Sequence, residues 1–272
     1  MRAFADIAVP PVECGGRLQE LPLRCLLDAV SLGSLMCPES HQLTIGEKSL
    51  MSPTVSKFGF WSALLASIFS IIYIVGQLAE WLGWLGSAGG PESSSTVLGL
   101  VVLLTPSLFL GSSFLLLMVS IHYIAPVERK IWSHAAVVFA TIYAALISIN
   151  YFVQLTFVAP HIVRGEVESI RSFLFTPFDS FLYAVDILGY SFMSLATLFA
   201  AFVFTGQGLE RTARRFLIAN GLLLPFLLLQ NYYHPLIWPA SLWAITFPGA
   251  TISLAMLFRS RNPSLENDRS FH

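Results

Sequence analysis

The sequence predicts an all-α membrane protein, a polytopic bundle of six transmembrane helices with both termini in the cytoplasm. The chain of 272 residues is 55% hydrophobic and only 11% charged, and its mean hydropathy is +0.71. An average soluble domain is about 25% charged. A soluble protein of 30.0 kDa cannot bury that much apolar surface. The composition therefore indicates that the lipid bilayer is the main partner of this chain.

Long apolar stretches separated by short polar connectors define the predicted helices. Each stretch reaches or approaches the roughly 20 helical residues that a bilayer core requires. Runs such as LGLVVLL and FLLLMVS are apolar on every side, whereas the strands of a membrane barrel alternate. Helices are therefore predicted rather than a barrel. The six predicted spans cover residues 60–85, 97–124, 132–159, 178–204, 212–231 and 236–258.

The fifth span is the least regular of the six. Asn220, Gly221 and Pro225 interrupt it, and its uninterrupted apolar run, LLLPFLLL, is short. The sequence leaves open whether this span crosses the bilayer completely.

The basic residues predict the orientation, because Lys and Arg beside a span tend to stay in the cytoplasm. Thirteen of the 15 basic residues precede the first span, follow the sixth, or lie in the second and fourth connectors. The opposite side holds only Arg164 and Arg171. We therefore expect three regions: a flexible cytoplasmic segment at 1–58, a six-helix transmembrane domain at 59–258 and a short cytoplasmic tail at 259–272.

Tryptophans fit the same frame, because Trp prefers the headgroup boundary. Trp243 is an exception that falls inside the sixth span. The others lie near predicted span ends: Trp61, Trp81, Trp84, Trp132 and Trp238.

The first 50 residues differ from the rest in composition. They carry mixed charge and no sustained periodicity, which is typical of a disordered tail, and no secretory signal is recognisable. Two interpretations stay open: a genuine tail, or a true start at Met51 with a non-native segment before it. Without a targeting peptide, we expect the bacterial inner (plasma) membrane.

Polar residues of the third and fourth spans are predicted to share one depth. At 1.5 Å per residue, Asn150 and Gln154 lie about 14 Å and 8 Å from the outer end of their span, and Asp186 lies about 12 Å in. Because positions 4, 7 and 11 apart share a helix face, Asp186 also aligns with Asp179, Tyr183 and Tyr190.

Other spans add polar groups to the same outer layer. The first span supplies Gln77 and Glu80, and the end of the fifth supplies Gln230 and Asn231. Pro106, Pro225 and Pro248 are expected to bend their helices, and bent helices are common around membrane binding cavities. We therefore hypothesise a water-accessible pocket for a small polar solute or ion, open to the non-cytoplasmic side. Its expected ligand-binding residues are Asp186, Asn150, Gln154, Tyr183, Tyr190, Gln77, Glu80, Gln230 and Asn231.

The alternative is that these polar groups only join neighbouring helices. Asn and Gln often do so, at about 0.6 kcal/mol per contact on average. Asp186 differs, because a carboxylate at that depth costs a few kcal/mol unless it is protonated, hydrated or paired. No Lys or Arg lies within a span interior to pair with it.

Several chemistries are disfavoured by missing residues. No span contains a lysine for a retinal Schiff base, and no zinc-protease, serine-hydrolase or phosphate-loop motif occurs. His122 and His134 could ligate haem or a metal, but a metal site usually needs more ligands, so neither metal nor cofactor is expected. The cysteines fit no zinc or disulfide pattern, and no basic run suggests nucleic acid.

Two function classes remain open. The first is a small transporter or permease-like protein that binds a small polar solute or ion. The second is a non-catalytic sensor or scaffold subunit that binds a ligand or a partner protein. No nucleophile and base pair suggests an enzyme, and the sequence does not define the oligomeric state.

Overall fold

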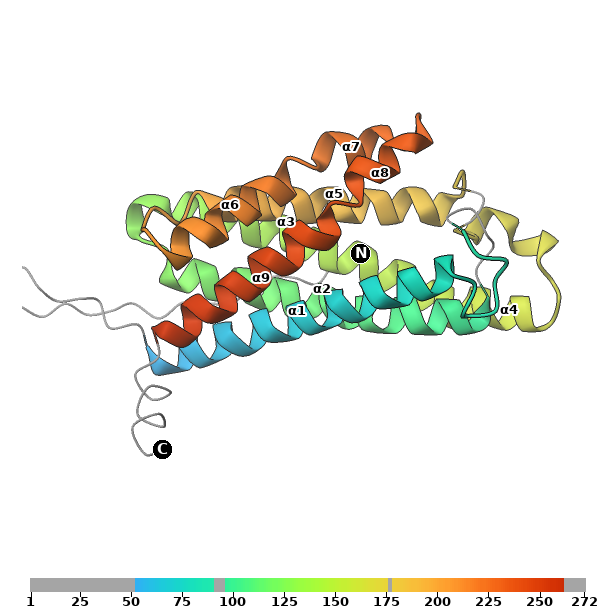
Figure 1. Ribbon diagram of the computed structural model, residues 1–272, viewed down its shortest axis with the longest axis horizontal. Coiled ribbons are helices and arrows are strands. Elements are labelled where there is room, and N and C mark those ends of the chain that lie inside the picture. Colours follow the sequence, from blue (N-terminus) through green and yellow to red (C-terminus); the bar gives the residue numbers. More distant parts are fainter. Residues whose placement is uncertain (1–51, 91–95, 176–177, 262–272) are drawn as a thin grey trace, which may run out of the picture. The chain divides into compact units, whose positions relative to one another are not determined.

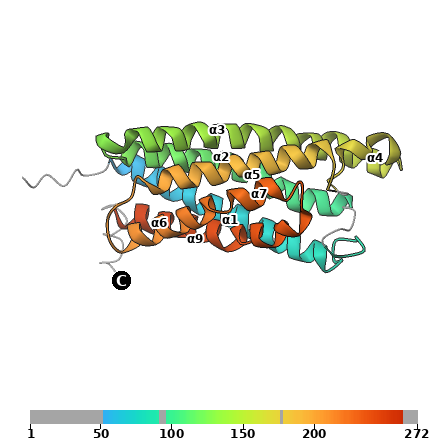
Figure 2. The same ribbon diagram turned by 90° about the horizontal axis from the view of Figure 1, so that it is seen from above.

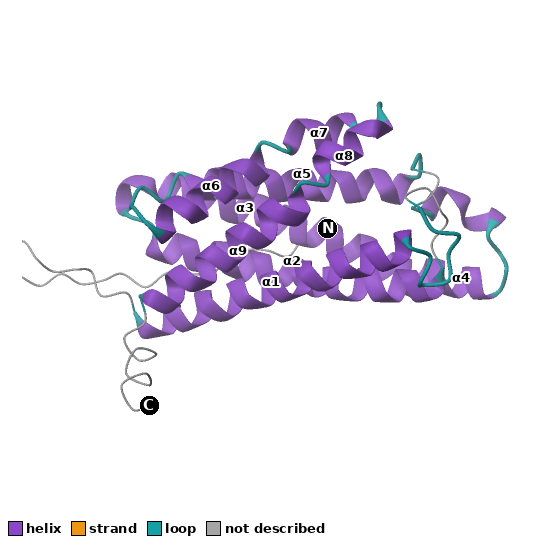
Figure 3. Cartoon of the chain, viewed as in Figure 1, coloured by secondary structure: helices purple, strands orange, loops and turns teal. Residues whose placement is uncertain are grey.

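A computed structural model describes the fold for residues 52–90, 96–175 and 178–261. Within these ranges every regular element is a helix, and six helical segments are long and apolar enough to cross a membrane (Figures 1 and 3). The predicted all-α, multi-pass class is therefore confirmed. The expectations for residues 1–50, including the alternative start at Met51, lie outside the described residues.

The first two spans are single long helices. Helix α1 (Pro53–Trp81) begins with proline in its first turn, where the missing N–H costs no hydrogen bond. Helix α2 (Val97–Ile124) is capped by Thr96, whose side chain accepts a hydrogen bond from the Gly99 N–H. Helix α1 begins six residues before the predicted domain boundary at 59, and its first turn already packs on α9 through the fully buried Ser56.

The third span is a composite of several helical types. A short 3₁₀ turn (η2, Val127–Arg129) leads into α3 (Lys130–Val153), which continues as a π-helical turn (η3, Gln154–Val158) and then as α4 (Ala159–Val163). A second 3₁₀ turn (η4, Glu168–Phe173) precedes α5 (Phe181–Ala201), the fourth span. π-Helical turns within α-helices are frequent at functional sites.

The last two spans are both interrupted. The fifth consists of α6 (Leu209–Gly221) and α7 (Leu224–Leu229), and the sixth consists of η5 (His234–Leu236), α8 (Ile237–Ala240) and α9 (Trp243–Ser260). Pro225 lies in the first turn of α7 and Pro239 lies in α8, so both prolines fall beside a break. By length and composition, the combined segment Leu209–Leu229 is sufficient to cross.

The six spans form a closed ring. Helix α1 contacts α2, α2 contacts α3, α3 contacts α5, α5 contacts α6 and α7, and α6 contacts α9, which returns to α1. Figures 1 and 2 show these helices running alongside one another. Consequently every span presents one face to a shared interior, while large apolar side chains such as Ile72, Phe152 and Ile245 lie exposed on the outside, as a lipid-facing surface requires.

Close contacts between small residues hold the ring together. Ser67 donates a hydrogen bond to Thr251 Oγ1 across 2.8 Å, and Ser56 donates one to the Phe258 carbonyl across 2.7 Å, so both bonds join α1 to α9. A Cβ at Gly221 would approach Leu198 Cβ to 2.6 Å, which shows how closely α6 approaches α5. Small residues are what allow membrane helices to pack at this separation.

The two ends of the bundle differ in their content of Lys and Arg. One end, which we call the basic end, carries the start of α1, the connectors before α3 and α6, and the end of α9. Its basic residues are Lys57, Arg129, Lys130, Arg211, Arg214, Arg215, Arg259 and Arg261. The opposite, distal end is where α1, α4 and α7 end, and among the described residues it carries only Arg164 and Arg171 as Lys or Arg.

Candidate functional site

A cavity of about 440 Å³ lies within the distal half of the ring. The last turns of α1, the first turns of α2 and α5, and residues of α3, α7, α8 and α9 all line it, so each of the six spans contributes. This volume falls in the range that small-molecule sites occupy.

Most of the lining is aromatic or aliphatic. Aliphatic side chains include Leu100, Leu103 and Leu227, while Gln77 and Ser241 add polar groups. The aromatic residues of the lining are Tyr73, Trp81, Tyr151, Phe175, Phe178, Tyr183, Tyr190 and Trp243. The site thus combines an apolar wall with a few polar groups, as binding pockets usually do.

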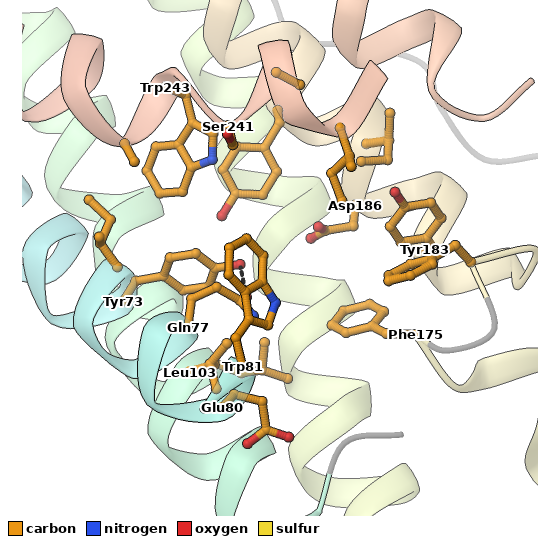
Figure 4. Close-up of a pocket in the computed structure, with 18 of the residues that line it drawn as sticks. Tyr73, Gln77, Glu80, Trp81, Leu103, Phe175, Tyr183, Asp186, Ser241 and Trp243 are labelled. Atoms are coloured by element: carbon orange, nitrogen blue, oxygen red, sulfur yellow. Dashed lines mark hydrogen bonds between the residues drawn. The ribbon is translucent and has the colours of Figure 1, made fainter. Parts of the chain in front are cut away.

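Asp186 presents its carboxyl group to this cavity. Figure 4 shows the side chain directed from α5 toward the space bordered by Tyr73, Trp81 and Trp243. Asn150 Nδ2, on α3, donates to Asp186 Oδ1 across 3.3 Å and to the Leu182 carbonyl across 3.1 Å. Asn150 and Asp186 therefore lie side by side as predicted, because α3 and α5 place them at the same depth in the bundle.

Tyrosine hydroxyls surround the carboxyl group. The Tyr151 and Tyr190 hydroxyls share a hydrogen bond of 3.1 Å, and Tyr73 donates to Gln77 Oε1 across 3.3 Å. The Tyr190 and Tyr73 rings both pack on Trp243, with centroids 5.7 Å and 5.5 Å from its ring. These contacts fix the wall of the cavity on the side of α1 and α9.

Glu80 is buried at the edge of the cavity, with 5% of its surface exposed. Neither carboxylate oxygen has a hydrogen-bond partner among the described residues. Its carboxylate lies against Gly99, where a Cβ would approach Oε2 to 2.6 Å. Glu80 is therefore held inside the protein wall.

The remaining predicted site residues divide into two groups. Gln77, Tyr183, Tyr190 and Gln230 line the cavity, as Asp186 and Glu80 do. Asn150, Gln154 and Asn231 are not part of the lining.

The three predicted residues outside the lining differ in their surroundings. Asn150 is fully buried behind Asp186. Gln154 is also fully buried and donates to the Phe173 carbonyl across 2.7 Å, so it ties the π-helical turn to η4. Asn231 is exposed because the chain turns just after α7, and Asp179 is exposed because it precedes α5.

Four aromatic residues line the cavity although they were not predicted as site residues: Trp81, Trp243, Phe175 and Phe178. Trp81 was assigned to the headgroup boundary, Phe175 lies in a connector of ordinary composition, and Phe178 was predicted only as the first residue of the fourth span. Trp243 could have been recognised as a site residue from the sequence, because it is the tryptophan that does not fall near a predicted span end.

An aromatic layer lies between the cavity and the basic end. Phe114, Tyr143 and Phe247 are all at most 1% exposed. The Phe114 ring packs on Tyr143 and on Phe247, with centroids 5.7 Å and 5.5 Å apart, and Tyr143 contacts Tyr190. These buried, mutually packed rings lie on the side of the cavity that faces the basic end.

His122 and His134 pack together near the basic end, with ring centroids 5.7 Å apart. His122 Nδ1 lies 2.9 Å from Ser133 Oγ, and the Lys130 ammonium donates to the His122 carbonyl. In the described part of the chain no group of three or more His, Cys, Asp or Glu residues is arranged to hold a metal. This pair therefore has the surroundings of an interfacial packing contact.

The chain matches no known protein family, no curated protein and no solved structure.

Proposed function

We propose that this protein is a small transporter or permease-like bundle that binds a small polar solute or ion in its distal cavity. The observation that carries the proposal is the Asp186 carboxyl group, directed into a cavity that all six spans line. An ionisable group within a membrane bundle is expensive, and such groups commonly mark solute or ion pathways.

The helices are interrupted beside the cavity, and such breaks allow short helical segments to move. The breaks between α6 and α7 and between α8 and α9 fall near Leu227 and Ser241, which line the cavity, and the π-helical turn follows Tyr151 closely. Transporters commonly bind solute where helices are discontinuous, near the middle of the membrane. We propose that the short segments α7 and α8 shift relative to α6 and α9.

The proposed orientation places the basic end in the cytoplasm and the cavity toward the opposite side, in a bacterial inner membrane. The segregation of Lys and Arg to one end supports this orientation. A solute would then enter from outside the cell.

A sensor or scaffold subunit is the second candidate, and the aromatic layer favours it. Phe114, Tyr143 and Phe247 separate the cavity from the basic end. A sensor would keep this layer closed and change conformation on ligand binding, whereas a transporter would open it during each cycle.

Binding is tested first, by thermal unfolding of the purified protein with choline, Na⁺, glycerol or glutamate at matched ionic strength. At least one probe is expected to raise the unfolding temperature of the native protein and not that of Asp186→Asn. A probe that binds is then tested in proteoliposomes by counterflow. Accumulation above the protein-free level supports transport, and binding without accumulation supports the sensor.

A further inference from the structure

The ionisable groups of the cavity wall are all acidic among the described residues. Among the described residues that line it there are two carboxyl groups, Asp186 and Glu80, and no Lys, Arg or His. Aromatic rings cover much of the remaining wall. A solute that complements this wall carries a positive charge.

Unpartnered oxygen atoms point to the same charge. Both Glu80 carboxylate oxygens and Gln230 Oε1 are buried without hydrogen-bond partners among the described residues, and both residues line the cavity. Gln230 is 3% exposed and Glu80 is 5% exposed. A carboxylate oxygen or amide carbonyl accepts hydrogen bonds and donates none, so these buried atoms add negative potential to the cavity wall.

The aromatic wall adds a second kind of cation recognition. Tyr73 and Tyr190 flank Trp243 with ring centroids 5.5 Å and 5.7 Å away, and Figure 4 shows Trp81 and Asp186 bordering the same space. Ring faces carry partial negative charge and attract ammonium groups, with Trp as the best ring. Aromatic enclosures of this composition are the known protein solution for quaternary ammonium ligands.

We propose that the solute is an organic monocation of the alkylammonium class, bound with its charged nitrogen between Asp186 and the rings of Tyr73, Tyr190 and Trp243. This inference rests on the proposed function, because it names the solute of the same cavity. The lining of Leu100, Leu103 and Leu227 is suited to the alkyl groups, which an inorganic ion lacks.

An inorganic cation fits the cavity less well. Na⁺ or Ca²⁺ needs several oxygen ligands converging on one point, about six to eight for Ca²⁺. Figure 4 shows Asp186 and Glu80 on different sides of the cavity, so their carboxylates do not form one coordination shell. A diffuse alkylammonium charge requires no such convergence.

The test compares choline with 3,3-dimethyl-1-butanol, its neutral isostere in which carbon replaces the charged nitrogen. Binding to the purified protein in nanodiscs is followed by tryptophan fluorescence and by calorimetry, with sodium chloride at matched ionic strength as a further probe. Choline is expected to bind at least about tenfold more tightly than the isostere, since cation–π and ion-pair contacts distinguish them.

Variants of one tryptophan separate recognition from folding. Trp243→Leu is expected to weaken choline binding at least about tenfold, and Trp243→Phe to restore part of the loss because it keeps an aromatic face. Trp132→Leu is the matched control. Trp132 packs on Phe199 and Phe202 near the basic end, away from the cavity, and its loss is expected to leave choline affinity unchanged.

The outcomes distinguish the two levels of the proposal. Equal binding of choline and the isostere, or preference for Na⁺, glycerol or glutamate, would overturn the alkylammonium assignment while leaving a solute site in place. Failure of every probe to bind the folded native protein would contradict the proposed function as well. Equal loss of choline affinity in Trp132→Leu and Trp243→Leu would also overturn the assignment.

Discussion

Asn150 on α3 holds the carboxyl group of Asp186 on α5, with its Nδ2 donating to Asp186 Oδ1 across 3.3 Å and to the Leu182 carbonyl across 3.1 Å. One fully buried amide therefore joins two spans and positions Asp186, the one aspartate among the described residues of the cavity wall. Asn150 is therefore expected to have two roles: it joins α3 to α5, and it holds the Asp186 carboxyl group in place for binding.

Replacement of Asn150 by leucine is expected to lower stability and to weaken binding together. Interhelical hydrogen bonds within a membrane contribute about 0.6 kcal/mol on average and at most about 1.7 kcal/mol, so we expect a loss in this range. Unfolding by denaturing detergent and choline binding measure the two effects. Thr156→Val is the control, because exposed Thr156 bonds only to the carbonyl of Phe152 on its own helix. Unchanged choline binding in a destabilised Asn150→Leu would assign Asn150 a purely structural role.

Asp186→Asn is expected to fold and to lose solute binding. The substitution keeps the shape of the side chain and removes the negative charge, so cation affinity is expected to fall at least about tenfold. Asp179→Asn is the matched control, since exposed Asp179 lies before α5 and does not line the cavity. If Asp186→Asn leaves folding, binding and transport all unchanged, Asp186 does not bind the solute.

Asn220 is expected to be a stabilising residue of the fifth span. It is fully buried, donates to Thr197 Oγ1 across 3.1 Å and accepts from Thr246 Oγ1 across 3.0 Å, so it joins α5, α6 and α9. Asn220→Leu is expected to lower the free energy of unfolding by about 1–3 kcal/mol, because the buried Thr197 hydroxyl and the half-buried Thr246 hydroxyl each lose a partner. Denaturing-detergent titration measures it, with the exposed Thr212→Val as control. A stability equal to that of the control would contradict this role.

Gly221 is expected to be intolerant of alanine. The added Cβ would lie 2.6 Å from Leu198 Cβ and 3.0 Å from its Cα, and a backbone atom cannot move aside without shifting α5. Overpacking of this kind costs about 1–3 kcal/mol. At Gly111 the added Cβ would lie 3.5 Å from Ala144 Cα, which is an ordinary contact, so Gly111→Ala is the control in the same unfolding assay. Equal stability of the two variants would mean that α5 and α6 pack less closely.

The fold class and the shared depth of Asn150 and Asp186 followed from the sequence. Span length requires only a count of apolar residues, and helical rise fixes depth when two spans are regular over the counted stretch. Gln154 ends α3 in regular helical register, with its N–H bonded to the Asn150 carbonyl, but its side-chain amide donates to the Phe173 carbonyl and does not line the cavity. A helical-rise count gives the depth of Gln154 and cannot anticipate this contact with η4.

The aromatic part of the site was not predictable from spacing. Trp81 satisfies the rule for interfacial tryptophans and still lines the cavity, because the connector beyond α1 folds beside it. Asn220 looked like an interruption of an apolar run, whereas its partners Thr197 and Thr246 lie on other helices and become visible only when the ring closes. Pairings between distant helices depend on the packing of the whole bundle.

Cysteine labelling of Ser241 in intact cells tests the central claim most directly, namely that the cavity is reached by water from the non-cytoplasmic side. In a background with Cys14, Cys25 and Cys37 changed to serine, Ser241→Cys lines the cavity, exposed Ser169→Cys marks the distal end and exposed Gln207→Cys marks the basic end. Cationic and anionic impermeant methanethiosulfonates serve as probes. We predict that both reagents label Ser169→Cys, that the cationic one labels Ser241→Cys faster and is blocked by choline, and that Gln207→Cys is protected. Labelling of Ser169→Cys with no labelling of Ser241→Cys by either reagent would contradict the claim.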